Sequence, residues 1–169
     1  FSGSLNTGGI LVAGTNATMY AYNNTIDCDG GTAFGLRNFT AGSRMMAKNN
    51  LVRGCSDSYT GTFMAGTDYN STDSADVIGQ GSNNKISQTF AFVDINNDDY
   101  HLTAADTGAK DAGTELCADS YLPFSTDIDG NSRPCSPSTW DIGADEIVQA
   151  MININRNVNF GRGVNFNAK

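Results

Sequence analysis

The sequence predicts an all-β chain whose short strands stack in successive coils, and three observations lead to this prediction. Only 17% of the 169 residues are charged, whereas 19 are glycine and much of the rest is Asn, Thr, Ser and Asp. This composition is poor in helix formers and rich in turn formers. A pattern of about 26 residues recurs in the first third of the chain, and residues 127–146 have the turn-rich composition of a terminating segment.

The repeat relates residues 20–27 (YAYNNTID) to residues 46–53 (MAKNNLVR) at a constant offset of 26. The two Asn-Asn dipeptides coincide, and Ile26 aligns with Val52. Self-similarity at a fixed period in a β-type sequence indicates a solenoid, in which each coil contributes a few short strands. We expect the asparagine side chains to hydrogen-bond along the stack of coils.

The remaining elements extend this pattern. Residues 8–13 predict a buried strand of a preceding coil, and residues 67–72 predict a degraded coil, so that about four coils fit between residues 1 and 90. Residues 90–94 predict a further strand, and residues 140–144 a short apolar strand that closes the segment.

The four cysteines are even in number, and no C-x-x-C pair occurs. Cys28 and Cys55 would face each other across adjacent coils, so a disulfide between them is geometrically plausible. Cys117 precedes the terminating segment and Cys135 lies within it, and a disulfide that closes the loop between them would stabilise the fold by about 3 kcal/mol. Two disulfides predict an oxidising, extracellular setting, and four buried free thiols are the alternative. His101 has no cysteine nearby, so the sequence does not predict a zinc site.

Four sequence stretches together resemble the C-terminal end of right-handed parallel β-helix proteins, namely 90–94 (FAFVD), 99–102 (DYHL), 127–133 (DIDGNSR) and 140–146 (WDIGADE). The most similar group is the pectate-lyase-like surface proteins with choice-of-anchor Q domains, and the resemblance spans roughly residues 16–146. It implies a right-handed parallel β-helix, a single-stranded solenoid, that ends in a C-terminal cap.

This resemblance implies three regions, which are β-helix coils over 1–90, a C-terminal cap over 91–147 and an extended β tail over 148–169. The cap is expected to shield the open edge of the last coil and to bury Trp140 and Ile142 against the interior. The net charge of −8 disfavours binding to nucleic acid. No apolar run is long enough to predict a membrane span.

One constellation could carry chemistry. The 26-residue register would place four charged residues on one face, where they are candidates for carbohydrate binding or catalysis: Asp27, Asp29, Arg53 and Asp57. Polysaccharide lyases on the resembled fold use a basic residue beside carboxylates, and hydrolases on it use clustered carboxylates. A solvated face with an ion-pair ladder is the interpretation that we favour, because surface pairs are common and usually inert.

The terminating segment also carries oxygen donors. Asp127, Asp129 and Asn131 suggest a calcium site, although Gly130 does not occupy the position that an EF-hand loop requires. A turn-stabilising loop is therefore favoured, and apart from calcium no cofactor is expected. His101 is expected to be a hydrogen-bonded structural histidine and not a catalytic base.

The tail changes in composition and alternates strictly between apolar residues and asparagine, which predicts a half-buried strand. Its basic residues include Arg156 and Arg162. The apolar positions predicted to mediate assembly are Ile152, Ile154, Val158, Phe160, Val164 and Phe166. Such a strand is expected either to lie on the acidic body of its own chain or to pair with neighbouring chains in a homo-oligomer, as strands do when they extend an open sheet edge.

Two functions follow as hypotheses. The first is a non-catalytic structural or adhesive module on a virion or cell surface, held in an assembly by its C-terminal strand and contacting neighbouring chains and glycans. The second is a carbohydrate-active enzyme, a polysaccharide lyase or hydrolase of the pectate-lyase-like superfold. We expect the first, because the second depends mainly on an analogy of fold.

Overall fold

The structure, a computed structural model, describes residues 8–148, and no α-helix occurs in that part of the chain. The chain is therefore all-β, as predicted. Its elements are β1 (Gly8–Val12), β2 (Thr18–Tyr22), β3 (Thr25–Asp27), β4 (Phe34–Asn38), β5 (Arg44–Lys48), β6 (Leu51–Arg53), β7 (Asp57–Thr60), β8 (Ser71–Thr72), β9 (Phe92–Asp94), the 3-10 helix η1 (Ile95–Asn97) and β10 (Asp99–Leu102).

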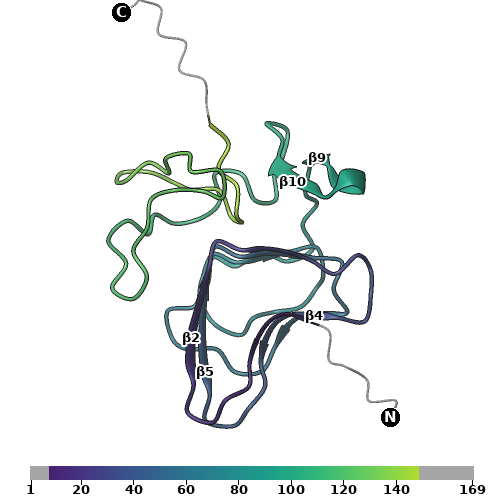
Figure 1. Ribbon diagram of the computed structural model, residues 1–169, viewed down its shortest axis with the longest axis vertical. Helices are drawn as coiled ribbons and strands as arrows, with labels where there is room; N and C mark the ends of the chain where they lie inside the picture. Colours follow the sequence, from purple (N-terminus) through teal and green to yellow (C-terminus); the bar gives the residue numbers. More distant parts are fainter. Residues whose placement is uncertain (1–7, 149–169) are drawn as a thin grey trace, which may run out of the picture.

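Eight of these strands form three small parallel sheets, ordered β1-β4-β7, β2-β5 and β3-β6-β8. The chain visits the three sheets in the same order on its first two passes, β1, β2 and β3 and then β4, β5 and β6, and the third pass adds β7 and β8 to two of the sheets (Figure 1). We call this part of the molecule the three-sheet body. None of the described strands closes into a barrel.

The predicted offset of 26 residues holds between the first two passes in all three sheets. Gly8 pairs with Phe34, Thr18 with Arg44 and Thr25 with Leu51. The third pass is shorter, as the pairing of Phe34 with Asp57 and of Leu51 with Ser71 shows. The sequence repeat thus records the register of real strand neighbours, and it fades where the passes shorten.

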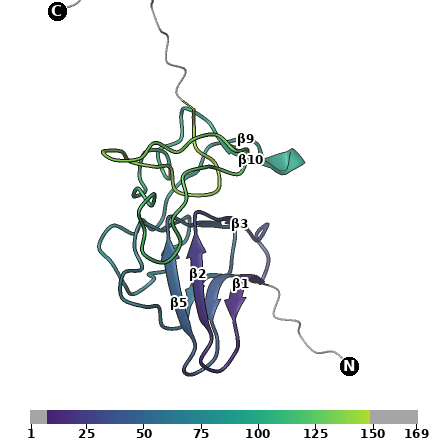
Figure 2. The same cartoon turned by 60° about the vertical axis from the view of Figure 1, so that its left-hand side comes forward.

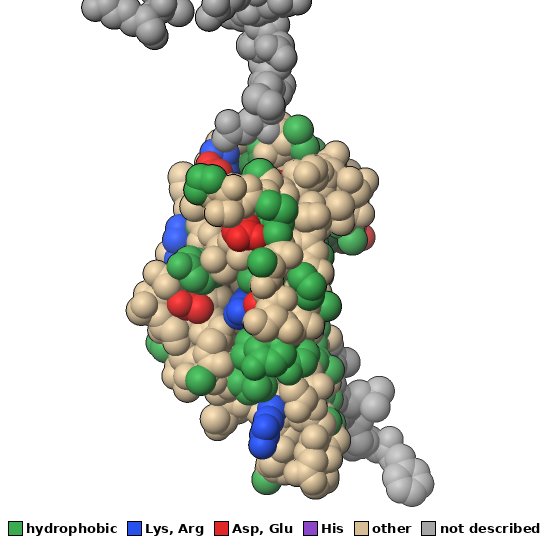
Figure 3. All heavy atoms as spheres, turned by 90° about the vertical axis from the view of Figure 1, so that its left-hand side faces the viewer, with side chains coloured by type: hydrophobic (Ala, Val, Ile, Leu, Met, Phe, Trp, Pro, Cys, Tyr) green, Lys and Arg blue, Asp and Glu red, His purple; other side chains and the backbone are tan. Residues whose placement is uncertain are grey.

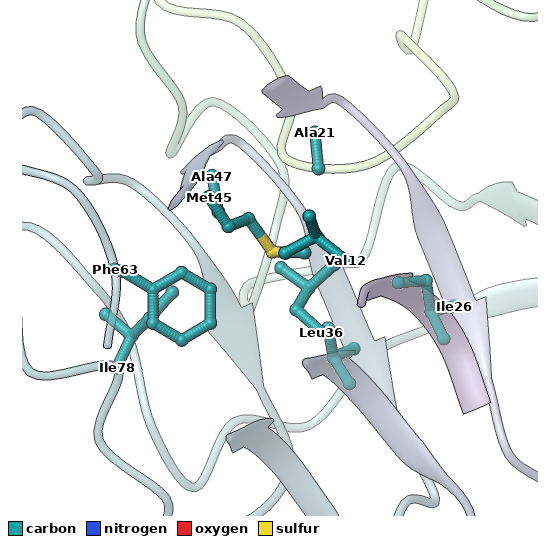
Figure 4. Close-up of a cluster of buried hydrophobic side chains, with 9 residues drawn as sticks. Val12, Ala21, Ile26, Leu36, Met45, Ala47, Phe63 and Ile78 are labelled. Atoms are coloured by element: carbon teal, nitrogen blue, oxygen red, sulfur yellow. The ribbon is translucent and has the colours of Figure 1, made fainter. Parts of the chain in front are cut away.

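The interior of the body is apolar. Side chains that alternate along the strands point inward from all three sheets, and Leu36, Met45, Ala47 and Val52 are fully buried there. Figure 4 shows this cluster, in which Met45 and Leu36 lie between Val12 and Phe63. The core therefore lies between the sheets, where successive passes supply equivalent residues.

Two glycines lie at equivalent places in β1 and β4. A Cβ added to Gly9 would lie 2.5 Å from Ile26 Cγ2, and one added to Gly35 would contact Val52 Cγ1 and lie 2.6 Å from the carbonyl oxygen of Ser58. The sheets approach so closely here that only glycine fits.

The first residue of each Asn-Asn dipeptide forms a corner between two sheets. Asn23 and Asn49 have φ values of 49° and 54°, in the left-handed region that asparagine tolerates better than most residues. Tyr69 takes the same conformation on the third pass, with φ of 57°. Each corner turns the chain from one sheet into the next.

The second asparagine of each corner forms a ladder along the stack. Asn24 donates from both its backbone N and its Nδ2 to Asn50 Oδ1, at 3.1 and 2.8 Å. Asn50 bonds to Asn70 in the same way, and Asn70 to Asn84. The ladder places a polar chain beside the core without leaving these amide groups unpaired.

The C-terminal segment, residues 91–148, lies along the outer side of the body (Figures 1 and 2). It begins with the antiparallel β9–β10 hairpin and continues largely without regular strands. Its hydrogen bonds reach corner residues of three successive passes: Asn23 Nδ2 to Gly143 O, Asn49 Nδ2 to Thr114 O, and Ser71 Oγ to Gly108 O. These contacts fall on the side of the stack, whereas we had expected the segment to cover the last open edge.

Trp140 and Ile142 are fully buried, but neither belongs to the interior cluster. Trp140 packs with Tyr22 and Met46. These two side chains point outward, because their neighbours in the strands point into the interior cluster. Ile142 packs with Leu51. The expectation that both residues fill the interior is therefore wrong. They cover the outer faces of the sheets instead.

Residues 140–144 do not form the predicted strand. Their backbone groups hydrogen-bond to separated places along the chain. Trp140 O accepts from Gly113 N at 2.7 Å, Ile142 N donates to Ala109 O at 2.9 Å, and Gly143 N donates to Asn49 O at 2.8 Å. No ladder forms, because these partners do not lie on one neighbouring strand.

Two disulfides are present, as predicted. Cys28–Cys55 joins the first two passes, and Cys117–Cys135 closes a loop within the C-terminal segment. No free cysteine occurs among the residues that the structure describes.

Candidate functional site

The polar groups of greatest chemical interest lie where β3 and β6 meet the C-terminal segment. Asp27 and Arg53 are register partners in β3 and β6, and Arg53 NH1 lies 2.5 Å from Asp27 Oδ2. The Asp27 side chain is 8% exposed and the Arg53 side chain is 26% exposed. The 26-residue register predicted from the sequence therefore brings this pair into contact.

The other two residues of the predicted charged face are placed differently. Asp29 is exposed, and its backbone N donates to Asp27 Oδ1 at 2.9 Å. Asp57 begins β7, where it pairs with Phe34 in a different sheet. The structure gathers Asp27, Asp29 and Arg53, and it places Asp57 on another sheet.

Tyr100 joins this site from β10. Its phenol lies beside Asp27 and its hydroxyl is 3.3 Å from Asp98 Oδ1. The hydrogen bond to Asp27, together with burial and the charges of both carboxylates, raises the pKa of Tyr100 to about 12. The phenol is therefore a proton donor at neutral pH.

His101, the next residue, links two carboxylates. Its Nδ1 is 2.5 Å from Asp99 Oδ1 and its Nε2 is 2.7 Å from Asp129 Oδ2. These hydrogen bonds raise the pKa of His101 to about 9. Asp145 also lies close, since one ligand atom each from His101, Asp129 and Asp145 falls within 4.8 Å of the others. This cluster could hold a cation.

The predicted calcium residues separate into two groups. Asp127 Oδ1 accepts hydrogen bonds from the backbone N of Asp129 and of Asn131, and its Oδ2 accepts from Asn131 Nδ2 at 3.0 Å. The Asp127 carboxylate thus holds its own turn together. The Asp129 side chain points to His101 instead of completing an oxygen cage with its neighbours.

A buried guanidinium organises the end of the segment. Arg133 NH1 lies 2.7 Å from Glu146 Oε2, and its NH2 donates to the carbonyl oxygens of Gly143 and Asp145. Burial beside Asp141 raises the pKa of Glu146 to about 7 even though Arg133 is adjacent.

A second site is an open cleft of about 550 Å³ between residues 66–69 and residues 114–119. Lys48 Nζ and Asp119 Oδ2, which lie 2.6 Å apart, line it together with Asp68, Tyr69 and Glu115. Figure 3 shows hydrophobic side chains beside basic and acidic side chains on the face that carries β2 and β5.

An aromatic pair lies on the same outer face. The rings of Tyr20 and Tyr121 stack with centroids 4.8 Å apart, and Tyr121 is 55% exposed. The sequence reasoning missed this pair and the cleft, because residues 114–122 meet the body only through the fold. The spacing of Tyr20 and Tyr22, which places both rings on one face of a strand, was the available signal.

The residues predicted to mediate assembly, from Ile152 to Phe166 with Arg156 and Arg162, lie outside the described residues. Within the described part of the chain, nothing helical has the length and apolarity that a bilayer crossing requires. No protein-family model, curated protein or solved structure matches this chain.

Proposed function

We propose that this chain is a non-catalytic structural or adhesive module, in which the three-sheet body is a right-handed parallel β-helix. The repeated order of the sheets and the offset of 26 residues between passes support this assignment. Right-handed connections are the rule between parallel strands. The sequence resemblance to pectate-lyase-like surface proteins points the same way.

The asparagine ladder is the observation that carries the structural role. Asn50 and Asn70 are fully buried, and their amide groups bond to the ladder and to backbone oxygen atoms. The polar side chains that recur along the chain are therefore used to hold passes together, and their hydrogen-bonding groups are not free for a substrate. A rigid, repetitive scaffold is suited to presenting a surface.

The adhesive surface in this proposal is the outer face around the cleft. Lys48, Glu115 and Asp119 supply charged and hydrogen-bonding groups, and Tyr121 supplies an exposed ring. Convergent polar groups beside aromatic side chains are typical of sites that bind polar ligands. Glycans on a virion or cell surface are the ligand class that fits this combination, and the two disulfides fit an extracellular location.

The tail is the proposed anchor. Its alternating apolar residues and three basic residues would pair with neighbouring chains or with the acidic body, because the rest of the chain is strongly acidic. The proposal makes residues 1–90 the coils, 91–147 the cap and 148–169 the strand that holds the chain in a homo-oligomer.

Removal of residues 151–169 tests the anchor. Size-exclusion chromatography with light scattering is expected to show an oligomer for the full chain and a monomer for the truncated chain. A full-length control in which Asn155, Asn157 and Asn159 become serine keeps the apolar face and should remain oligomeric. An oligomeric state that is unchanged by the truncation would contradict the proposed anchor.

A carbohydrate-active enzyme is the second candidate, and the contact of Arg53 with Asp27 beside Tyr100 supports it. Sugar release from a panel of acidic polysaccharides, lost in Arg53→Ala and retained in Arg44→Ala, would favour catalysis. Arg44 is a suitable control because it is an exposed arginine of β5. Binding without product release would favour the adhesive module.

A further inference from the structure

We propose that His101, Asp129 and Asp145 bind a divalent transition-metal ion, which joins the β9–β10 hairpin to the end of the C-terminal segment. The inference is independent of the proposed adhesive function. It also differs from the calcium site expected from sequence, since Asp127 and Asn131 bond to each other within their turn.

The first argument is the placement of the donor atoms. His101 belongs to β10, whereas Asp129 and Asp145 come from two separate stretches of the C-terminal segment. Their ligand atoms lie within 4.8 Å of one another, and Nε2 and Asp129 Oδ2 are only 2.7 Å apart. Small side-chain rotations bring three such atoms to the separations found around one ion.

The second argument is the state of Asp145. Asp145 is 7% exposed, and its Oδ2 accepts a hydrogen bond from Leu102 N at 2.7 Å. Its Oδ1 receives no hydrogen bond from any residue between 8 and 148. This side chain lines a cavity of about 240 Å³ together with His101 and Tyr100. Asp145 thus presents a carboxylate to the cavity, beside the imidazole of His101.

The third argument is the orientation of the imidazole. Asp99 Oδ1 holds Nδ1, so the remaining nitrogen, Nε2, faces Asp129. Metal-binding histidines commonly make this carboxylate contact through the nitrogen that does not bind the metal. Asp99 is therefore a positioning residue, and Nε2 is the ligand, which gives up the proton that it shares with Asp129 when the ion binds.

The chemistry of the donors selects the class of ion. One imidazole nitrogen with two carboxylate oxygens suits zinc, nickel, manganese or iron, while calcium prefers an all-oxygen site. Three protein ligands leave further positions open to solvent, because the side chains of His101 and Asp129 are 45% and 48% exposed. Binding would tie two parts of the fold together and would raise the thermal stability.

The test uses the full chain without an affinity tag and Zn²⁺ as the probe. The chain contains a single histidine, so its imidazole NMR signals report directly on His101. We expect calorimetry to give one ion per chain, the imidazole signals to shift on addition of Zn²⁺ and to broaden with Co²⁺, and the melting temperature to rise. Excess Ca²⁺ should reproduce none of these effects.

Variants make the result specific. His101→Gln and Asp129→Asn should each weaken Zn²⁺ binding by about tenfold or more. Asp98→Asn removes the same charge from the rim of the same cavity without touching a ligand, and it should bind as the wild type does. Because Asp129 is half exposed, its variant is expected to fold, which circular dichroism would verify.

Two outcomes would overturn the proposal. One is the absence of saturable Zn²⁺ binding and of any shift in the His101 signals at millimolar Zn²⁺. The other is equal weakening in Asp98→Asn and Asp129→Asn, which would show that the ion responds only to the overall acidity of this surface.

Discussion

Asn49 donates a hydrogen bond from Nδ2 to Oδ1 of Asn23, 26 residues earlier, at a distance of 3.1 Å. The same Nδ2 donates to Thr114 O at 2.7 Å, and Asn49 Oδ1 accepts from Thr114 N at 3.0 Å. One side chain thus links two passes of the body to the C-terminal segment. Its left-handed backbone is what points the amide toward that segment.

Asn49→Gly tests this link, because glycine keeps the left-handed backbone and removes only the amide. We expect the free energy of unfolding to fall by about 1–2 kcal/mol, since the partly buried backbone groups of Thr114 lose their partners. Urea unfolding, followed through the fluorescence of the single Trp140 and through far-UV circular dichroism, measures the loss.

Asn96→Gly is the matched control, because Asn96 is exposed, and it should change stability by less than about 1 kcal/mol. The two optical transitions should coincide in the wild type and separate in Asn49→Gly, where the C-terminal segment is held less firmly. Equal losses in both variants would show that the Asn49 amide contributes nothing specific.

Gly35→Ala should be strongly destabilising. The added methyl group would collide with Val52 and with the backbone of Ser58, and backbone cannot move aside as a flexible side chain can. We expect a loss of about 2–3 kcal/mol by chemical denaturation. Gly14→Ala should cost less, because this glycine is exposed and an added Cβ would meet only the Ala17 methyl group, at 3.1 Å. A tolerated Gly35→Ala would show that the sheets are less closely packed there.

Removal of either disulfide should lower stability by similar amounts. Cysteine-to-serine replacement of both residues in Cys28–Cys55, which are 27 residues apart, or in Cys117–Cys135, which are 18 apart, is expected to cost about 3 kcal/mol in the chain-entropy model. Denaturation curves of the two double variants would measure this. A loss confined to one variant would show that the other bridge does not constrain the unfolded chain.

Stability should decline as the pH rises through neutrality. The folded-state pKa of Glu146 is raised to about 7 from an ordinary value of 4.5, so the folded protein holds a proton between these pH values that the unfolded chain has released. The contribution is therefore complete below about pH 4.5 and is lost above pH 7, and it is on the order of 3 kcal/mol.

Unfolding measurements at pH 5 and pH 8 in the presence of EDTA would detect this difference. Glu146→Gln should reduce the dependence and leave the part due to His101, whose pKa is also raised, whereas Glu115→Gln, the matched change at the other glutamate, should preserve it. Arg133, Asp141 and Asp111 face Glu146 and contribute to its environment. A pH profile that is identical in Glu146→Gln would contradict the assignment to this group.

The sequence was informative wherever neighbours share a fixed spacing. The offset of 26 residues, the asparagine ladder, the pairing of Asp27 with Arg53 and the Cys28–Cys55 disulfide all follow from residues that lie at equivalent or nearly equivalent places on adjacent passes. Such contacts can be predicted because one period determines every neighbour along the stack.

The position of the C-terminal segment follows from no such period. Trp140 packs on Tyr22 and Met46, which lie far away in the sequence and point outward from their strands. One clue was present in β5, where Met45, Met46 and Ala47 follow one another and are all buried, which indicates a strand covered on both faces. The approach of Asp129 and Asp145 to His101 left no comparable pattern, because those residues meet only through the fold.

The attachment of the C-terminal segment to three passes also has a mechanical consequence. A force applied beyond Val148 would reach the body through bonds to Thr25, Asn49 and Ser71, which belong to different passes. Gly143 and Ala144 lie nearest to that end and bond to Asn23, Thr25 and Asn49, so tension reaches the first two passes before the bonds of Thr114 and Gly108. If the chain is held by its C-terminal end, the first two passes together bear the initial strain.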